Sequence, residues 1–591
     1  MKKFIYKTIQ ITCFTGLLAM GACNTFEAEP LEWILESDVT NPQDSTAVNM
    51  KSLHQTIYAS LPNLHTRLSN SYLDAATDDG VATRDKGGSG SLENYRNGNL
   101  SAENIASLDG SAWKNFYVGI RRANLFLEKI EGYPSSTQLT KEEIKRMKAE
   151  ARFLRAYFYF ELMKRWGGVP LLGDRVINYD EDWNIARSSL DECVQYILDE
   201  ISEEKPGSCY VDLYDVTKMP EGMVGRVNKG AAKALVSRLK LYLASPLYNP
   251  NNIQSKWQEA ADAAKAVMDM GIYDLHYTAE KKPDDTKDPT PGFLALFGDN
   301  AAFTTLNKET IMMKLSSGST SLESDNSPCG YQRNKCKGLT SPSQNLVDAF
   351  PMLDGKRIDD PTSKYAYDPQ NPYANRDPRL TYTVFYNGAA WLNRPVETFN
   401  GGLDRFSKPG LFTTQTGYYL RKFLGLNETK ADNSGFNGAY HHHQIFRYAE
   451  ILLNYAEALN ELGGDNVEIE NCLIQLRKRA GIEAGDNGRY GLPESYSRQE
   501  MREIIRNERR IELAFEEHRF WDIRRWKIAE DVMNEPVRGV EIHKQADGSF
   551  LYNYDVVVRT SVFEERMYWY PIPRGEMNGN TKLTQNPGWN Y

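Results

Sequence analysis

The stretch Ile445–Leu462, IFRYAEILLNYAEALNEL, decides the fold class. Its apolar and small residues recur at the three- and four-residue steps of a helix that buries one face: Ile445, Ala449, Leu452, Ala456 and Leu459. Small residues on such a face let a second helix approach closely. The stretch therefore predicts a helix that packs against a partner helix.

The same spacing recurs along the chain in Ile120–Ile130, Ala151–Leu162 and Ala232–Tyr242. Further helical candidates that could pair with these are Leu190–Ser202, Trp257–Met270 and Val467–Ala480. Alternating helices with small contact residues are typical of tetratricopeptide-like hairpins. The period is irregular, so we expect a mostly α fold built on helix pairs and no uniform solenoid.

A loop-rich insertion, about residues 272–443, separates the helical segments and is rich in Pro, Gly, Asn and Asp. Short strands are expected at Thr310–Leu315 and Leu380–Tyr386, where apolar and polar residues partly alternate. Loops held by a rigid scaffold often carry function. We therefore expect the ligand site in this insertion and in the Gly/Ser-rich stretch Asp78–Leu100.

The composition is that of a globular protein: of 591 residues, 41% are hydrophobic and 25% are charged. The chain has 70 Lys and Arg against 79 Asp and Glu, for a net charge of −9. Nucleic-acid-binding proteins normally present a net basic face, so this balance argues against nucleic acid as a partner.

The first residues predict a lipid anchor. Residues 1–22 have the features of a secretory signal: Lys2, Lys3 and Lys7 precede an apolar segment too short to span a membrane. The segment ends in Leu17–Cys23, LLAMGAC, which resembles a bacterial lipobox with Cys23 as the lipid-bearing residue. Residues 23–40 then form a tether, and residues 41–591 form one domain with its helical scaffold at about 41–271 and 444–530. A plain secretory signal with a chance cysteine is the alternative.

The cysteines leave one question open. Cys329 and Cys336 lie close in sequence and could form a disulfide in an oxidising compartment, or both could be free. None of the cysteine spacings fits a zinc site.

A search for catalytic motifs finds no P-loop and no H-E-x-x-H zinc helix. His441-His442-His443 favours a polar loop over a metal site, because successive side chains of an extended segment point to opposite faces. Asp78-Asp79 is a candidate carboxylate pair, although a turn before Gly80 is the favoured interpretation. We expect no metal, no cofactor and no enzymatic activity.

The segment Arg498–Lys527 is rich in Arg, with Glu and Asp interleaved. This pattern favours a salt-bridged helix over a nucleic-acid surface. The expected helix neighbours are Glu503 with Arg506 and Glu516 with Arg519. Its packing side would be Ile504, Ile511 and Phe515.

Seven stretches in order resemble the SusD/RagB family of outer-membrane nutrient-binding lipoproteins. They are Trp113–Ile130, Glu150–Pro170, Gly225–Tyr248, Asn375–Leu380 (NRDPRL), Phe446–Leu462, Arg506–Trp526 (RNERRIELAFEEHRFWDIRRW) and Gln585–Trp589 (QNPGW). The resemblance implies four tetratricopeptide-like helix pairs and an irregular second half that shapes the binding face. It also implies a surface-exposed, lipid-anchored protein of the cell outer membrane. Such a protein captures a glycan and passes it to a TonB-dependent, SusC-like transporter for import.

The ligand residues are nominated from chemistry, because no family motif carries them. Sugars present apolar C–H faces to aromatic rings and hydroxyl groups to polar side chains. Loop aromatics with polar neighbours provide the candidates Tyr95, Asn97, Phe297, Tyr331, Arg333 and Trp391. Each ring could instead be buried against the scaffold.

Three other functions remain open at this point. The same type of import complex could take a peptide or glycopeptide. A surface glycosidase lacks any supporting motif in the sequence. A structural subunit without a ligand of its own is the third alternative.

Overall fold

The computed structural model describes residues 46–590, apart from 69, 84–89, 178–180, 220–222, 224, 278–290, 299–306, 332–335, 406–412 and 426–439. The signal segment, Cys23, the predicted tether and Arg333 therefore lie outside the described residues. Helices dominate and the strands are short, which confirms the predicted mostly α fold.

The first part of the chain is helical. It contains α3 (Val48–Ala59), α4 (Gly90–Arg96), α5 (Ala112–Ile130), α6 (Lys141–Trp166), α7 (Leu190–Ile201), α8 (Lys229–Ala244) and α9 (Gln254–Met268). The middle part contains the short helices α10 (Pro291–Gly298), α11 (Ser321–Asn326), α12 (Gln344–Ala349) and α13 (Pro378–Thr383). The last part contains α14 (Tyr448–Leu462), α15 (Asn466–Ala480), α16 (Arg498–Glu512), α17 (His518–Arg525), α18 (Ala529–Met533) and α19 (Arg574–Gly579).

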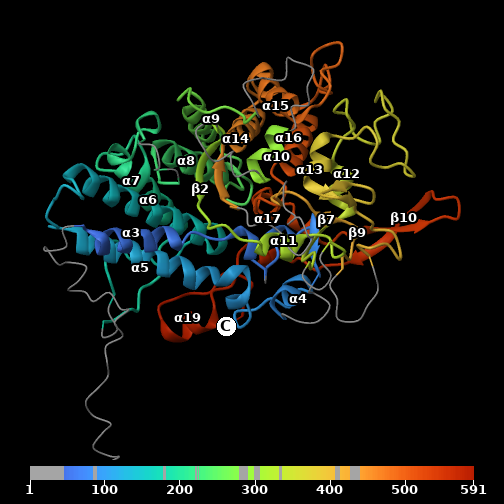
Figure 1. Ribbon diagram of the computed structural model, residues 1–591. Helices are drawn as coiled ribbons and strands as arrows, with labels where there is room; N and C mark the ends of the chain where they lie inside the picture. Colours follow the sequence, from blue (N-terminus) through green and yellow to red (C-terminus); the bar gives the residue numbers. More distant parts are fainter. Residues whose placement is uncertain are drawn as a thin grey trace, which may run out of the picture.

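The described strands form five two-stranded antiparallel sheets. They are β1 (Gly80–Ala82) with β3 (Thr340–Pro342), β2 (Thr310–Lys314) with β8 (His443–Arg447), β4 (Val384–Phe385) with β7 (Tyr419–Leu420), β5 (Ala390–Trp391) with β6 (Arg394–Pro395), and β9 (Val537–Lys544) with β10 (Phe550–Arg559). The β9–β10 hairpin projects from the side of the molecule opposite α7 (Figure 1).

Helices that follow each other in the chain pack as pairs, with α5 against α6, α8 against α9 and α14 against α15. Helix α14 also lies beside α9, although the whole loop-rich insertion separates them in sequence (Figure 1). At the α5–α6 contact a Cβ on Gly119 would lie 2.6 Å from the ring of Phe158. Only glycine permits this close approach. The helical segments on both sides of the insertion thus form one scaffold.

Side-chain caps fix several helix ends. Ser189 and Ser497 begin α7 and α16 with capping boxes, in which Ser and the Glu three residues later exchange hydrogen bonds with the backbone. Helices α14 and α15 end at Gly463 and Gly481, whose φ angles of 69° and 89° are the left-handed conformation that glycine adopts freely.

Two predicted boundaries are wrong. Ile445 belongs to β8, which pairs with β2, so the helix begins three residues later at Tyr448. The expected strand Leu380–Tyr386 is mostly helix α13, because the Asp377 side chain caps it and Pro378 occupies its first turn. Only Val384–Phe385 is strand there, whereas the strand expected at Thr310–Leu315 is present as β2.

The hydrophobic interior of the described residues consists of two clusters. The larger one lies between the scaffold helices, and includes Phe153, Leu235 and Leu452. The smaller one lies within the loop-rich region and includes Phe350 and Tyr419, together with Phe515 from the turn after α16. Cys329 and Cys336 belong to this second cluster, and neither forms a disulfide, so the possible bond between them is absent.

The Arg-rich segment is two helices and not one. The chain turns between α16 and α17, where Phe515 and Glu517 have φ angles of 62° and 66°. The predicted neighbour pair Glu516–Arg519 does not form, since Glu516 binds Arg447 and Lys422, and Arg519 binds Asp78. The charged groups of this segment therefore hold distant parts of the chain together.

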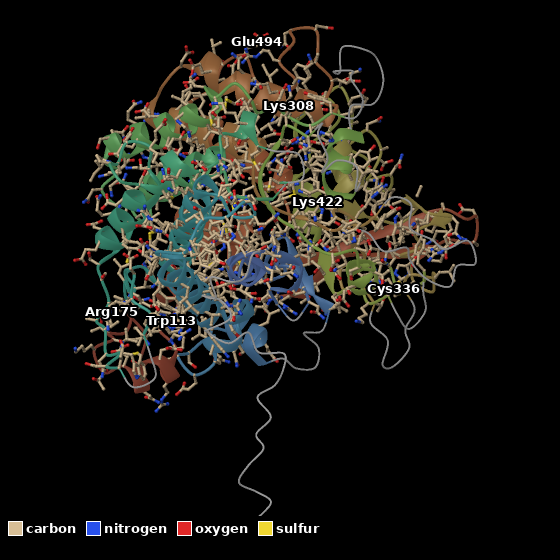
Figure 2. All side chains as sticks on the ribbon, turned by 60° about the vertical axis from the view of Figure 1, so that its left-hand side comes forward. Trp113, Arg175, Lys308, Cys336, Lys422 and Glu494 are labelled. Carbon is tan, nitrogen blue, oxygen red and sulfur yellow. The ribbon has the colours of Figure 1, made fainter. Side chains whose placement is uncertain are left out.

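A buried ion network lies between the two clusters. It consists of the five cations Arg379, Lys422, Arg447, Arg477 and Arg479 and the five carboxylates Glu309, Asp377, Glu508, Glu512 and Glu516. Arg447 lies 2.7 Å from Glu309, 2.8 Å from Glu512 and 2.7 Å from Glu516. Lys422 is near the centre of the molecule in Figure 2. The network joins the loop-rich region to α14, α15 and α16.

Burial and ion pairing have opposite effects on the pKa values of the charged groups in this network. Burial alone would raise the pKa of Glu512, but the charges of Arg479, Arg447 and Arg379 outweigh it and hold the pKa well below its usual range. Burial lowers the pKa of Lys422 to about 8 even though Glu516 lies 2.7 Å away. A carboxyl with a depressed pKa stabilises the folded state above its unfolded pKa of about 4.3, and that contribution is lost as the pH falls through the folded pKa.

We predict that Glu512→Gln lowers the free energy of unfolding by about 3–5 kcal/mol at neutral pH, because it leaves one uncompensated positive charge in the buried network. The difference in unfolding free energy from the unaltered protein should narrow as the pH falls below about 4, because Glu512 is then protonated in the unfolded chain while it stays ionised in the folded protein. Urea unfolding across this pH range measures both effects. Glu503→Gln, exposed on the same helix, is the control and should change stability by about 0.5 kcal/mol at most. A constant difference at all pH values would contradict the assignment.

Candidate functional site

Two of the predicted ligand residues, Tyr331 and Trp391, lie side by side in the loop-rich region. Their ring centroids are 4.6 Å apart. The Tyr331 hydroxyl donates hydrogen bonds to the carbonyl oxygens of Trp391 and Arg394, at 2.9 and 2.7 Å. Tyr331 thus holds the β5–β6 hairpin at both strands.

The other side of Tyr331 faces a charged pair. The Arg394 guanidinium lies 3.8 Å from the centroid of the Tyr331 ring, and donates to both carboxylate oxygens of Asp404 at 2.7 and 2.8 Å. Burial raises the pKa of Tyr331, so its hydroxyl stays protonated at neutral pH. Tyr331 is half-buried whereas Trp391 is only 6% exposed. An aromatic ring with adjoining polar groups suits the edge of a sugar.

The remaining candidates do not join this pair. Tyr95 is buried in the scaffold cluster against Phe520. Phe297 is buried in the second cluster, where its ring lies 4.4 Å from the Lys422 ammonium. Asn97 is exposed beside Val562. The rings of Tyr95 and Phe297 are only 1% and 4% exposed.

A pocket of about 550 Å³, the α3 pocket, opens where α3 and the start of α6 meet the end of β2. Its apolar lining is Leu61, Met147, Met223, Met313 and Leu315, and its charged lining includes Lys51, Glu143, Arg226 and Lys314. This volume falls in the range of small-ligand sites in proteins.

A fixed polar cluster forms one wall of the α3 pocket. The Tyr58 hydroxyl donates to Glu150 at 2.8 Å, and Arg226 bridges Glu150 at 2.7 Å and Glu143 at 2.5 Å. Burial raises the pKa of Glu150 to about 7, although the Arg226 charge opposes that rise. Burial and Arg226 lower the pKa of His54 to about 3, so this imidazole is neutral at physiological pH. The Tyr58, Glu143 and Arg226 side chains of this wall line the pocket and can donate or accept hydrogen bonds there.

Sequence reasoning missed this pocket. His54, Glu150 and Arg226 come from three segments far apart in the chain, and no local motif contains more than one of them. The apolar stripes predicted the helices but not which polar residues meet between them.

The other sequence candidates are engaged in packing. Asp78 and Asp79 are buried and bind Arg510, and Asp78 also binds Arg519. His441 is buried and its ring lies 2.7 Å from Glu323. No cluster of His, Cys, Asp or Glu among the described residues has the arrangement of a metal site. None of the described helices has the length and apolar character needed to cross a bilayer.

Comparison with known proteins assigns the family. Residues 35–241 match a family model described as starch-binding associating with outer membrane, and residues 308–589 match the SusD family model. The chain belongs to the SusD/RagB family. The resemblance noted in the sequence is thereby confirmed.

Relatives of this SusD/RagB family member match it over nearly its full length. A SusD-like protein of Formosa agariphila is 25% identical over 553 residues, 91% of this chain and 95% of that protein. A crystal structure of a SusD-like protein from Bacteroides fragilis is 27% identical, covers 92% of this chain and 98% of that chain, and has a TM-score of 0.73. A SusD-like carbohydrate-binding protein from the same species is 25% identical, with a TM-score of 0.71 over 91% of this chain and 99% of that chain.

We predict that Trp391→Ala lowers the free energy of unfolding by about 3–5 kcal/mol, because it leaves a cavity beside Tyr331. Trp183→Ala is the control, since Trp183 is 44% exposed. It should lower the free energy of unfolding by clearly less than Trp391→Ala does. Urea unfolding measures both. A Trp391→Ala protein of unchanged stability would show that the ring is not a packing element, and would favour a role in ligand contact.

Proposed function

We propose that this protein is a surface glycan-binding lipoprotein that captures an oligosaccharide or polysaccharide without cleaving it. The observation that carries the proposal is the full-length match to a SusD-like carbohydrate-binding protein. The family model described as starch-binding and associating with the outer membrane supports both the ligand class and the location. The captured glycan would pass to a TonB-dependent, SusC-like transporter.

The loop-rich region offers suitable ligand chemistry. Tyr331 is half-buried and offers an aromatic edge to a sugar, and Arg394, which the buried Asp404 holds in place, can donate to the hydroxyl groups of that sugar. We assign Trp391 to the support of Tyr331. Asn97 is the other exposed candidate, and the roles of Tyr95, Phe297 and Arg333 stay predictions.

A binding role without catalysis agrees with the engagement of Asp78 and Asp79. Both carboxylates form ion pairs with Arg510, so neither is open to a substrate as acid or nucleophile. The chemistry of glycoside hydrolysis needs two carboxyl groups that flank the scissile bond.

A peptide or glycopeptide is the second candidate ligand, and one observation favours it. Met147, Met223 and Met313 line the α3 pocket beside the charged groups of Lys51 and Glu143. Methionine adapts its shape to varied apolar side chains, which suits peptide binding.

We predict that calorimetry against a polysaccharide panel detects binding, whereas a panel of short peptides gives none. Tyr331→Ala should weaken the binding of that glycan about 10-fold or more, roughly 1.4 kcal/mol. Tyr365→Ala, another half-buried tyrosine of the loop-rich region, is the control and should bind normally. Melting curves must show that both variants are folded. Binding of peptides alone, or steady release of reducing ends from the bound glycan, would overturn the proposal.

We predict that the lipid on Cys23 holds the protein at the outer membrane, since each buried CH₂ contributes about 0.8 kcal/mol. Cys23→Ala should therefore move the protein from the membrane fraction to the soluble fraction when the partner barrel is absent. Cys329→Ala is the matched control and should stay with the membranes. Affinity purification of the unaltered protein in mild detergent should bring down a large TonB-dependent barrel. Recovery of the protein alone, while other membrane complexes survive, would contradict its association with such a transporter.

A further inference from the structure

A second pocket, the polar pocket, adjoins the α3 pocket at the C-terminal end of α3. It has a volume of about 340 Å³ and shares Ala59, Leu61 and Lys314 with the α3 pocket. Its charged lining residues are Arg67, Arg122 and Lys314, and no carboxylate of a described residue lines it. The charge facing this pocket is therefore positive.

Among the described residues, Arg67 has carboxylate partners, whereas Arg122 and Lys314 have none. Arg67 lies 2.6 Å from Asp109 and 2.9 Å from Glu517. Arg122 instead donates to the Thr56 carbonyl at 3.2 Å and the Ser60 hydroxyl at 2.9 Å.

Lys314 donates to the carbonyl of Leu61. Neither Arg122 nor Lys314 forms an ion pair with a carboxylate that the structure describes. Each cation thus has only neutral oxygen partners among the described residues.

Capping of α3 accounts for only part of this charge. The C-terminus of a helix carries about half a negative charge. Arg122 and Lys314 bring two full positive charges to the end of α3, so an excess of about 1.5 charges remains. Burial lowers the pKa of Lys314, which shows that its charge is costly where it stands. An incoming anion would remove that cost.

The rest of the lining suits a hydroxylated ligand. Asn63, Thr66 and Asn115 are exposed at the pocket and can bond hydroxyl groups, and Val118 adds an apolar surface that is 37% exposed. A guanidinium group binds carboxylate and sulfate oxygens through two parallel hydrogen bonds, and an ammonium group binds them as a point charge.

We propose that the polar pocket binds an acidic substituent of a glycan, a carboxylate or a sulfate ester, through Arg122 and Lys314. This inference rests on the proposed glycan-binding function and specifies the ligand as an anionic glycan. Carboxylate and sulfate share the chemistry that the pocket recognises, so two matched pairs of probes separate them.

The first experiment is calorimetry with charged and neutral forms of the same sugar backbones. Oligogalacturonate is compared with its fully methyl-esterified form for the carboxylate, and κ-carrageenan oligosaccharides with their desulfated form for the sulfate. We expect the charged form of at least one pair to bind about 10-fold more tightly than its neutral partner, a difference of about 1.4 kcal/mol.

The second experiment uses variants with that charged glycan. Arg122→Gln and Lys314→Gln remove a charge and keep a hydrogen-bond donor for the end of α3, and each should weaken binding about 10-fold. Lys314→Arg keeps the charge and should bind nearly as well as the unaltered protein. Arg121→Gln is the matched control, because Arg121 is the exposed neighbour on the same helix and does not line the pocket. Melting temperatures show whether each variant keeps its fold.

The outcomes separate this inference from the function on which it rests. Equal binding of charged and neutral forms, or no loss of affinity in Arg122→Gln and Lys314→Gln, overturns the anionic ligand and leaves glycan binding intact. Binding only to neutral glycans also overturns the anionic ligand and leaves glycan binding intact. Absence of binding to every glycan overturns the proposed function itself.

Discussion

The contact of Arg447 with Glu309, Glu512 and Glu516 is the interaction on which the rest of the architecture depends. Glu309 stands just before β2, Arg447 ends β8, and Glu512 and Glu516 flank the turn from α16 to α17. The hydrophobic interior divides at this place, so apolar burial alone does not fix one cluster against the other. Charges removed from water tolerate little displacement, because a lost partner leaves an unpaired charge in a medium of low dielectric. The ion pairs thereby act together with the β1–β3 strand pairing to hold the loop-rich region against the rest of the protein.

This arrangement explains how much of the fold could be predicted from the sequence. Apolar periodicity is a local property, and it locates α5, α6, α8 and α14 well. The partner of a charged residue is not local. Helical spacing pairs Glu516 with Arg519, whereas the partners of Glu516 in the structure are Arg447 and Lys422, 69 and 94 residues away. The start of α14 is predicted too early for a related reason, since Ile445 continues the apolar stripe while its backbone belongs to β8.

Local sequence patterns were also insufficient to predict which residues meet at the candidate site. Tyr331 and Trp391 are chosen because each is an aromatic residue of the loop-rich insertion with polar neighbours in sequence, and the two rings do lie together. The same criterion of an aromatic residue with polar neighbours selects Tyr95, whose ring packs inside the scaffold against Phe520. The pockets at α3 gave no signal in the sequence, since residues such as Glu150 and Arg226 meet only after the helices have packed.

The structure contains two kinds of charge that respond differently to the surrounding medium. The buried network has as many carboxylates as cations and is shielded from solvent, so dissolved ions screen it little. Arg122 and Lys314 border an open pocket and have neutral oxygen partners there, so their attraction for an anion weakens as ionic strength rises. A change in salinity can therefore release a bound acidic ligand while the architecture that presents it stays intact.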